Sequence, residues 1–327
     1  MAAIDPDAPD LSPAALRAAL ARADAVDRQL ALIAIEDACE PTFVEPLIEA
    51  LADPDPTVRR LAIERLEDLG DPRAVPGLIR AVEDGDPDVR DAAADALRQL
   101  RGADAVPLLL AAIDHPNPAV RRAVIVALRE LRDERGRRDL ERALHDRDPR
   151  VRGEAVVSLA FLPRADDPSV LAACLGDPDA VVRRLVIGAL GGFPAAAVVP
   201  VLLRALDDHD WQVRREAVLI LGRLAAPDAA PALIARLTDP YWQVRKEAAL
   251  ALGQVHAAAA VPALIGLLAS EVADLRRAAA VALGEIGAAA ALPALEPLRR
   301  DDDAEVRKTA VRAIANVRAR SGAGDLN

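Results

Sequence analysis

The residues with the most obvious potential for chemistry are the histidines and cysteines: His115, His145, His209, His256, Cys39 and Cys174. Imidazole and thiolate groups bind transition metals, but metal sites bring them together at short, regular spacings. No such spacing occurs here, and the first three histidines fall in predicted turns. We therefore interpret the histidines as solvated turn residues. We expect no catalytic residue, no metal and no cofactor, and the two distant cysteines fit a reduced, cytoplasmic compartment.

A second chemical feature is a pair of near-identical segments that hold both tryptophans. The segment "DWQVRREAVLILGRL" begins at Asp210, and "YWQVRKEAALALGQV" begins 31 residues later at Tyr241. Aromatic side chains beside arginines are frequent anchors in binding surfaces. Trp211, Tyr241 and Trp242 are equally compatible with a packing role over a turn, and the sequence leaves both interpretations open.

The step of 31 residues continues through the whole chain without insertion or deletion. Ten arginines obey it: Arg28, Arg59, Arg90, Arg121, Arg152, Arg183, Arg214, Arg245, Arg276 and Arg307. Each except the first follows a valine or leucine, which we call the core valine of its repeat. Three residues before most core valines stands an aspartate or asparagine: Asp55, Asp86, Asn117, Asp148, Asp179, Asp210 and Asp303. A fixed period of this length is typical of solenoid proteins.

Each repeat reads as two helices. In "DPDPTVRRLAIERLEDLG", from Asp53 to Gly70, an aspartate stands in the capping position, proline follows it, and apolar residues recur at helical spacing. A shorter helix follows, with Pro76 in its first turn. The pattern predicts an all-α solenoid, a right-handed superhelix of about ten 31-residue helix pairs over residues 12–320, with disordered tails at 1–11 and 321–327. We expect the arginines to pair with aspartate carboxylates across the turns.

The pattern "DxDxxVRxxAxxALGxL" followed by "AVPxLIxAL", as in residues 86–100 and 260–268, resembles the short bacterial HEAT-like repeats named after phycobilisome lyases. The resemblance covers nearly the whole chain and implies the solenoid fold. The family includes lyases, hydroxylases and many binding scaffolds, so it does not imply one function. The di-iron hydroxylases of this kind use His-Glu pairs, and no histidine here precedes a glutamate.

Charge and composition exclude some classes of function. The formal net charge is −11, and acidic residues outnumber basic ones 22 to 10 within residues 1–100. A nucleic-acid partner is therefore not expected, because nucleic-acid binding depends on cationic surfaces. The start of the chain lacks the basic and apolar segments of a signal peptide, and no uncharged apolar stretch approaches membrane-spanning length.

The surface of the longer second helices is the expected binding face, which should be concave. Two rows of residues recur on it, two and six positions after the core valine. The basic row contains Arg122, Arg184, Arg215, Lys246 and Arg277. The apolar row contains Val126, Val157, Leu219, Leu250 and Val281. Aliphatic residues flanked by charge indicate an interaction site, unless the apolar row is partly buried between helices.

One repeat is unusual because it carries additional glycines. Gly191 occupies a position where later repeats also have a small residue, but Gly188 and Gly192 do not. Glycine within a helix costs about 0.5–1 kcal/mol relative to alanine. With Phe161 nearby in the sequence, we interpret Gly188 and Gly192 as a notch in the middle of the array into which a partner inserts.

These observations predict a non-enzymatic scaffold or adaptor that binds another protein with an acidic and apolar contact surface. The alternative is an accessory protein, or a lyase-like enzyme, that handles a cofactor or chromophore in a pocket at the middle of the array.

Overall fold

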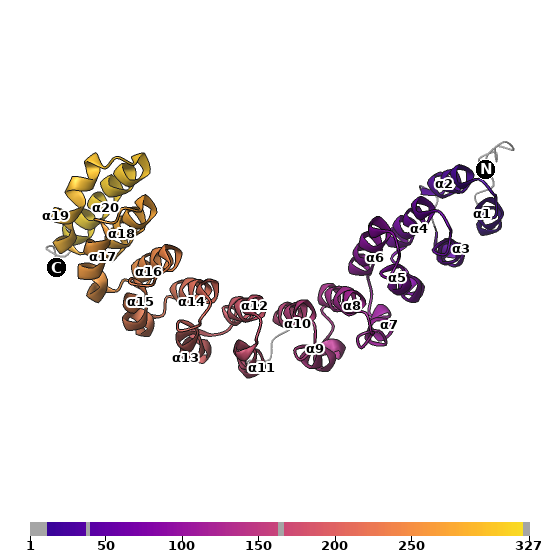
Figure 1. The fold of residues 1–327 in the computed structure, drawn as a ribbon, viewed down its shortest axis with the longest axis horizontal. Helices are drawn as coiled ribbons and strands as arrows, with labels where there is room; N and C mark the ends of the chain where they lie inside the picture. Colours follow the sequence, from indigo (N-terminus) through magenta and orange to yellow (C-terminus); the bar gives the residue numbers. More distant parts are fainter. Residues whose placement is uncertain (1–11, 37–39, 163–166, 323–327) are drawn as a thin grey trace, which may run out of the picture. The chain divides into compact units, whose positions relative to one another are not determined.

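The computed structural model describes residues 12–36, 40–162 and 167–322, and every described element is helical (Figure 1). The chain forms two compact units, Met1–Arg164 and Ala165–Asn327. None of the helices in the described ranges has the length and apolar character needed to cross a bilayer. The predicted tails lie almost wholly outside the described residues, as does Cys39, and the last helix runs to Gly322. Cys174 is half-buried.

Unit 1 contains five helix pairs, each made of a shorter first helix and a longer second helix. The pairs are α1 (Pro13–Leu20) with α2 (Ala25–Ala34), α3 (Val44–Ala50) with α4 (Pro56–Leu69), α5 (Val75–Ala81) with α6 (Pro87–Gln99), α7 (Ala105–Leu110) with α8 (Pro118–Leu131), and α9 (Arg137–Ala143) with α10 (Pro149–Phe161). The second helices form one layer of the unit and the first helices the other (Figure 1).

Unit 2 repeats this arrangement with five more pairs. They are α11 (Ser169–Ala173) with α12 (Ala180–Leu190), α13 (Ala195–Ala205) with α14 (Trp211–Arg223), α15 (Ala230–Arg236) with α16 (Trp242–Gln254), α17 (Val261–Leu267) with α18 (Ala273–Ile286), and α19 (Leu292–Leu295) with α20 (Ala304–Gly322). A 3-10 helix, Glu296–Arg300, extends the short α19. The prediction of an all-α solenoid of ten helix pairs is confirmed.

The second helices begin where the capping residues predict. In α14, the Asp210 carboxylate accepts the backbone N–H groups of Gln212 and Val213 at 2.8 and 3.2 Å. These are two of the four N–H groups that a helix start leaves without an intrahelical partner. Gly70 caps the C-terminal end of α4, and its φ of 58° lies in the left-handed region that glycine adopts without steric cost.

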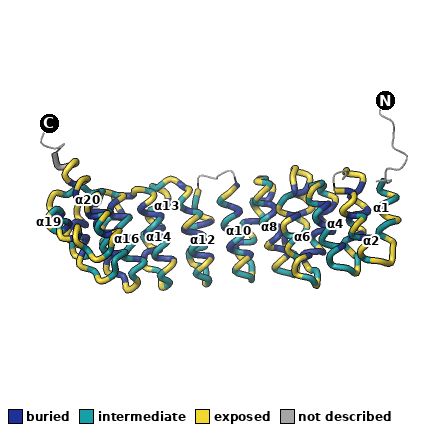
Figure 2. The backbone as a smooth tube through the Cα atoms, turned by 90° about the horizontal axis from the view of Figure 1, so that it is seen from above, coloured by how far each residue is buried: buried dark blue, intermediate teal, exposed yellow. Residues whose placement is uncertain are grey.

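The core of each unit lies between its two helix layers. The core valines are fully buried, as Val58, Val120 and Val213 illustrate with 0% exposure. The burial pattern follows each helix as a stripe in Figure 2. Fully burying one such side chain contributes about 1.5–3 kcal/mol, so the repeated columns carry most of the stability.

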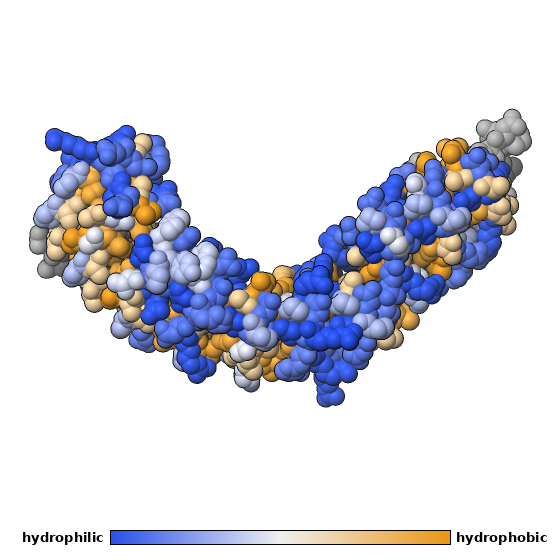
Figure 3. Space-filling model, in the orientation of Figure 1, coloured by the Kyte–Doolittle hydropathy of each residue, from blue (hydrophilic) through white to orange (hydrophobic). Residues whose placement is uncertain are grey.

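Not all apolar side chains reach the core. On α2, the first of the second helices, Val26, Leu30 and Ile33 stay about half exposed, at 58%, 57% and 49%. Apolar surface is visible over α2 at one end of unit 1 and over α18 to α20 in unit 2, whereas α6 and α8 present a hydrophilic surface (Figure 3).

Candidate functional site

The arginine that follows the core valine connects successive repeats. In α14, Nε and Nη2 of Arg214 donate to the two carboxylate oxygens of Asp239, at 2.7 and 2.9 Å. The Nη1 group donates to the backbone carbonyls of Asp208 at 2.8 Å and His209 at 3.3 Å. Arg214 therefore joins the turn before its own helix to the turn before α16. Bidentate pairs of this kind combine strength with a fixed geometry.

The same geometry recurs along both units. Nε and Nη2 lie 2.7–2.9 Å from a carboxylate in six pairs: Arg28–Asp53, Arg59–Asp84, Arg121–Asp146, Arg183–Asp208, Arg214–Asp239 and Arg276–Asp301. We call the ten arginines the arginine ladder, and each arginine with its acceptors a rung. The predicted pairing of arginines with carboxylates is confirmed for these six rungs.

The carboxylates of the ladder form a column that the sequence analysis missed. The sequence predicted aspartate partners across the turns without indicating which ones, and the pairing residue stands two positions before the capping aspartate. Asp208 is an example: it pairs with Arg183, and its Oδ1 accepts the N–H of the capping residue Asp210 at 2.9 Å. This column also obeys the 31-residue step, and that signal could have revealed it: Asp53, Asp84, His115, Asp146, Asp177, Asp208, Asp239, Ser270 and Asp301.

Pairing with the ladder arginines lowers the pKa of carboxyl groups such as those of Asp239 and Asp301. Burial alone would raise the pKa of the Asp239 carboxyl, but hydrogen bonds from Arg214 and from the backbone N–H of Tyr241 outweigh it and lower that pKa. At Asp301, the hydrogen bonds from Arg276 are the largest cause of a lowered pKa. The direction is the same in both cases because each carboxylate accepts charge-assisted hydrogen bonds that its protonated form would lose.

The aromatic residues of the doubled segment cover one rung. The rings of Trp211 and Tyr241 stack with their centroids 5.4 Å apart and their planes at 11°. The Cζ atom of Arg214 lies 5.8 Å from the centroid of the Tyr241 ring. Asp239, paired with this arginine, is the only acidic residue in the described ranges that is buried, at 5% exposure. Trp211 and Tyr241 thus have a packing role, while Trp242 is half-buried and belongs to the next rung.

The basic row in unit 2 lies on the second helices and is half-buried. Arg184 donates to a glutamine side chain of α14 at 3.0 Å, and Arg277 pairs with an aspartate of its own helix at 2.6 Å. Arg215 and Lys246 pair with no carboxylate among the described residues. The Nε atom of Arg215 is also buried without a hydrogen-bond partner. Two cations at the centre of the row therefore have unused bonding capacity.

The apolar row is half-buried as well. Leu219, Leu250 and Val281 each keep part of their surface exposed on the same face as the basic row. The sequence left open whether these residues face solvent or a neighbouring helix. In the structure all three side chains are of intermediate burial. Each side chain is partly covered by the chain and partly accessible to solvent.

The three glycines at the C-terminal end of α12 and just after it differ in their surroundings. A Cβ atom at Gly191 would lie 2.9 Å from Arg223 and 3.1 Å from Ile220, so Gly191 permits close packing of α12 against α14. Gly188 is exposed, and a Cβ atom there would meet nothing within 4 Å. Gly192 lies in the turn after α12, so the prediction that it is a helical glycine is wrong, and the cost of a helical glycine does not apply to it.

The remainder of the predicted site residues lie in unit 2, and four belong to unit 1: Arg122, Val126, Val157 and Phe161. Phe161 ends α10 with 51% exposure, and two arginine guanidinium groups lie 6.0 and 5.6 Å from its ring centroid. Such contacts stabilise cation and ring together and give Phe161 a local partner.

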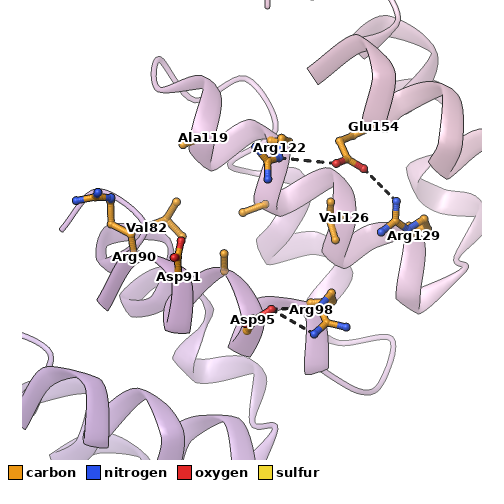
Figure 4. A pocket seen from close by; sticks show the side chains of 12 residues that line it. Val82, Arg90, Asp91, Asp95, Arg98, Ala119, Arg122, Val126, Arg129 and Glu154 are labelled. Carbon is orange, nitrogen blue, oxygen red and sulfur yellow. Dashed lines mark hydrogen bonds and ion pairs between the residues drawn. The ribbon is translucent and has the colours of Figure 1, made fainter. Parts of the chain in front are cut away.

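Arg122 and Val126 help to line a hollow on the second helices of unit 1, of about 370 Å³ (Figure 4). Its other walls are charged. Glu154 of α10 accepts from Arg129 at 3.0 Å and lies 3.7 Å from Arg122, while Asp95 pairs with an arginine of its own helix. The charges of this hollow thus largely compensate one another within the chain.

The four histidines lie in turns and remain apart. The Nε2 atom of His115 is 3.8 Å from Glu83, and the Nδ1 atom of His256 is 3.0 Å from a backbone carbonyl. His145 and His209 are exposed. Across the described part of the chain, no three His, Cys, Asp or Glu side chains are placed to hold a metal ion together.

The comparisons with known proteins agree with this architecture. A family model described as HEAT repeats matches residues 13–98, 75–160, 168–250 and 230–315. Among curated proteins, none matches this sequence.

Several solved structures are similar in fold. An engineered protein superimposes with a TM-score of 0.51 and 22% identity, covering 94% of this chain and 98% of the other. The Escherichia coli protein YibA gives 0.59 and 23%, covering 77% and 95%. Kap95p, solved in a study of its binding to RanGDP, gives 0.56 and 13%, covering 93% and 54%. At these identities the similarity shows the fold alone.

Proposed function

Because this chain belongs to the family of HEAT-repeat proteins, we propose that it is a non-enzymatic scaffold whose second helices in unit 2 bind another protein. The observation that carries the proposal is the pair of cations at the centre of the basic row. Arg215 and Lys246 lie on a regular helical surface and pair with no carboxylate among the described residues. A partner's carboxylates would supply the missing acceptors.

The chemistry of this face favours a partner that is both acidic and apolar. Leu219, Leu250 and Val281 run parallel to the basic row and provide exposed aliphatic surface. Two glutamates, Glu216 and Glu247, stand next to the cations in sequence and moderate the positive potential. Selective binding therefore depends on where the partner's charges fall against the individual cations, and not on net charge alone.

The fold relatives are compatible with this proposal. Kap95p, which shares the α-solenoid fold at 13% identity, binds the protein RanGDP. Stacked helix pairs present an extended surface of regularly spaced side chains, which suits binding to an elongated partner segment.

Capture of partners on the immobilised full-length protein from the cells that produce it tests the proposal. We expect the double variant Arg215→Glu and Lys246→Glu to lose at least tenfold in affinity for the captured protein. The matched control reverses Arg204 and Arg300, which are exposed in unit 2 and have no ion-pair partner in the described residues. Equal loss in both double variants would show that general charge, and not this face, governs binding.

The alternative function, a cofactor or chromophore pocket at Gly188 and Gly192, gains no supporting observation. The helix face at Gly188 is exposed and open to solvent, and Gly192 lies in a turn. We therefore propose one function only.

A further inference from the structure

Two successive rungs of unit 2 have the same architecture but not the same residues. The first rung is complete: Arg214 pairs with Asp239, and the stacked rings of Trp211 and Tyr241 cover the pair. One repeat later, the equivalent positions hold Trp242, Arg245, Ser270 and Val272. We call this second set the open rung, because a serine replaces the aspartate and a valine replaces the tyrosine.

The guanidinium of the open rung is oriented as in the complete rungs. The Nη1 group of Arg245 donates to the carbonyls of Asp239 at 2.8 Å and Pro240 at 3.1 Å. The corresponding distances at Arg214 are 2.8 and 3.3 Å. Two fixed acceptors hold the plane of the group, so Nε and Nη2 point where the carboxylate lies in the complete rungs.

The other edge of this guanidinium is unused. Nε and Nη2 of Arg245 have no hydrogen-bond partner in the part of the chain that the structure describes. Neither atom is among the buried side-chain atoms of the described residues that lack a partner, so both remain accessible to solvent. In six other rungs these two atoms donate to a carboxylate at 2.7–2.9 Å. The open rung is therefore a preorganised bidentate donor for an oxyanion.

The serine preserves the turn but not the rung. Its Oγ accepts the N–H of Val272 at 3.2 Å, just as Oδ1 of Asp239 accepts the N–H of Tyr241 at 3.0 Å. A hydroxyl, however, provides one short oxygen where the aspartate provides two, one of them for each arginine donor. Ser270 thus keeps the backbone in place and leaves the position of the carboxylate open.

The aromatic part of the rung is open as well. Trp211 stacks on Tyr241, but the residue that would stack on Trp242 is Val272. No ring pair other than Trp211–Tyr241 is found in the described ranges. A half-buried indole and an unused guanidinium edge are therefore both carried by the first turn of α16, three residues apart.

We propose that the open rung binds a carboxylate side chain of the partner protein, an aspartate or glutamate that is followed closely by an aromatic residue. The partner's carboxylate takes the place of Asp239 against Arg245, and its ring takes the place of Tyr241 against Trp242. This site rests on the proposed function, because it adds a specific contact to the same partner. The proposed function can still hold if this site binds nothing.

The equivalent break in unit 1 is less suited to the same role. There His115 occupies the carboxylate column opposite Arg90, and its imidazole already accepts the N–H of Asn117 at 3.2 Å and lies 3.8 Å from Glu83. A ring and a neighbouring carboxylate occupy the surroundings of Arg90. The open rung of unit 2 has only a hydroxyl and a valine in those places.

The chain itself supplies the probe for a test. Acetyl-Thr-Asp-Pro-Tyr-amide copies residues 238–241, which complete the preceding rung. The full-length protein is labelled with ¹⁵N and titrated with this peptide, and the two indole N–H signals are followed by NMR. We expect a saturable shift of the Trp242 signal, with a dissociation constant of about 1 mM or weaker, as for a contact of this size. The Trp211 signal should stay in place, because its rung is complete.

Matched controls separate the site from weaker explanations. The peptide with Asn in place of Asp should bind at least tenfold more weakly. In the Ser270→Asp variant an internal carboxylate occupies the rung, so the peptide should no longer shift Trp242, and Tm should rise by about 2 °C. The Ser270→Asn variant is nearly the same size but uncharged, and should show no comparable rise in Tm.

Three results would overturn the proposal. The first is that the Trp242 signal of the wild-type protein does not shift when the peptide concentration is 20 times a dissociation constant of about 1 mM. The second is an equal shift in the Ser270→Asp variant. The third is an equal shift with inorganic phosphate, which would identify a general anion site. If the peptide fails but the reversal of Arg215 and Lys246 still abolishes partner binding, the open rung is dropped and the proposed function stands.

Discussion

Replacing Arg214 by alanine tests whether the arginine ladder is structural, and Arg245 provides an internal comparison. Arg214 and its partner Asp239 are almost completely buried, with side-chain exposures of 10% and 2%. Removing the arginine leaves a buried carboxylate without its counter-charge, which costs about 3–5 kcal/mol. Replacing Arg245 removes hydrogen bonds to two backbone carbonyls and leaves no carboxylate behind. At about 1 kcal/mol for each bond, that substitution costs about 1–2 kcal/mol.

Urea unfolding followed by tryptophan fluorescence measures the difference in unfolding free energy, and its signal comes from the two helices that carry these arginines. The protein has two tryptophans, Trp211 and Trp242, and each stands at the start of the helix that carries one of the two arginines. We expect the Arg214→Ala variant to lose about 1–4 kcal/mol more unfolding free energy than Arg245→Ala, which is the difference between the two costs. Arg204→Ala, an exposed arginine of α13, is the control for a loss of positive charge and should differ little from the wild type.

A double variant sharpens the test. Removing Asp239 together with Arg214 takes away the uncompensated charge, so the double variant should be more stable than Arg214→Ala alone. Equal destabilisation by Arg214→Ala and Arg245→Ala, or a change below about 0.5 kcal/mol for both, would refute the structural reading of the ladder. If partner binding were lost at the same time with stability unchanged, the ladder would instead be a binding feature.

Further predictions concern pH, glycine and the ring stack. The pKa of Asp239 in the folded protein lies below its unfolded value of about 3.9, so the stabilisation from this carboxylate is present above that value and is lost as pH falls through the folded pKa. The urea midpoint of unfolding should therefore stay constant from about pH 5 to about pH 8 and fall below about pH 4. The fall should be less steep in the Asp239→Asn variant. Gly188→Leu should stabilise α12 by about 0.5–1 kcal/mol and weaken partner binding, because the site is open and exposed. Gly191→Leu should destabilise by about 1–3 kcal/mol, because its side chain would overlap α14. Tyr241→Ala should cost about 1–2 kcal/mol in urea unfolding, since it removes the ring stacked on Trp211 and uncovers Arg214.

The sequence by itself determined the repeat, the helix pairs and the core. These features depend on local rules, because a capping aspartate such as Asp210 starts a helix through N–H groups two and three residues away. The spacing of apolar residues along one helix likewise decides which face is buried. The sequence also indicated that the recurring arginine pairs with a carboxylate, although it did not indicate which one.

Only the tertiary structure decided the partners across repeats. Arg214 reaches Asp239, 25 residues away, because stacking places successive turns side by side. The same stacking distinguishes Gly191, where an added Cβ atom would collide with α14, from Gly188, where an added Cβ atom would meet nothing within 4 Å. The half-burial of the apolar row also depends on how each helix is rotated against its neighbours. That rotation results from the summed packing of many side chains, and a period of 31 residues carries no information about it.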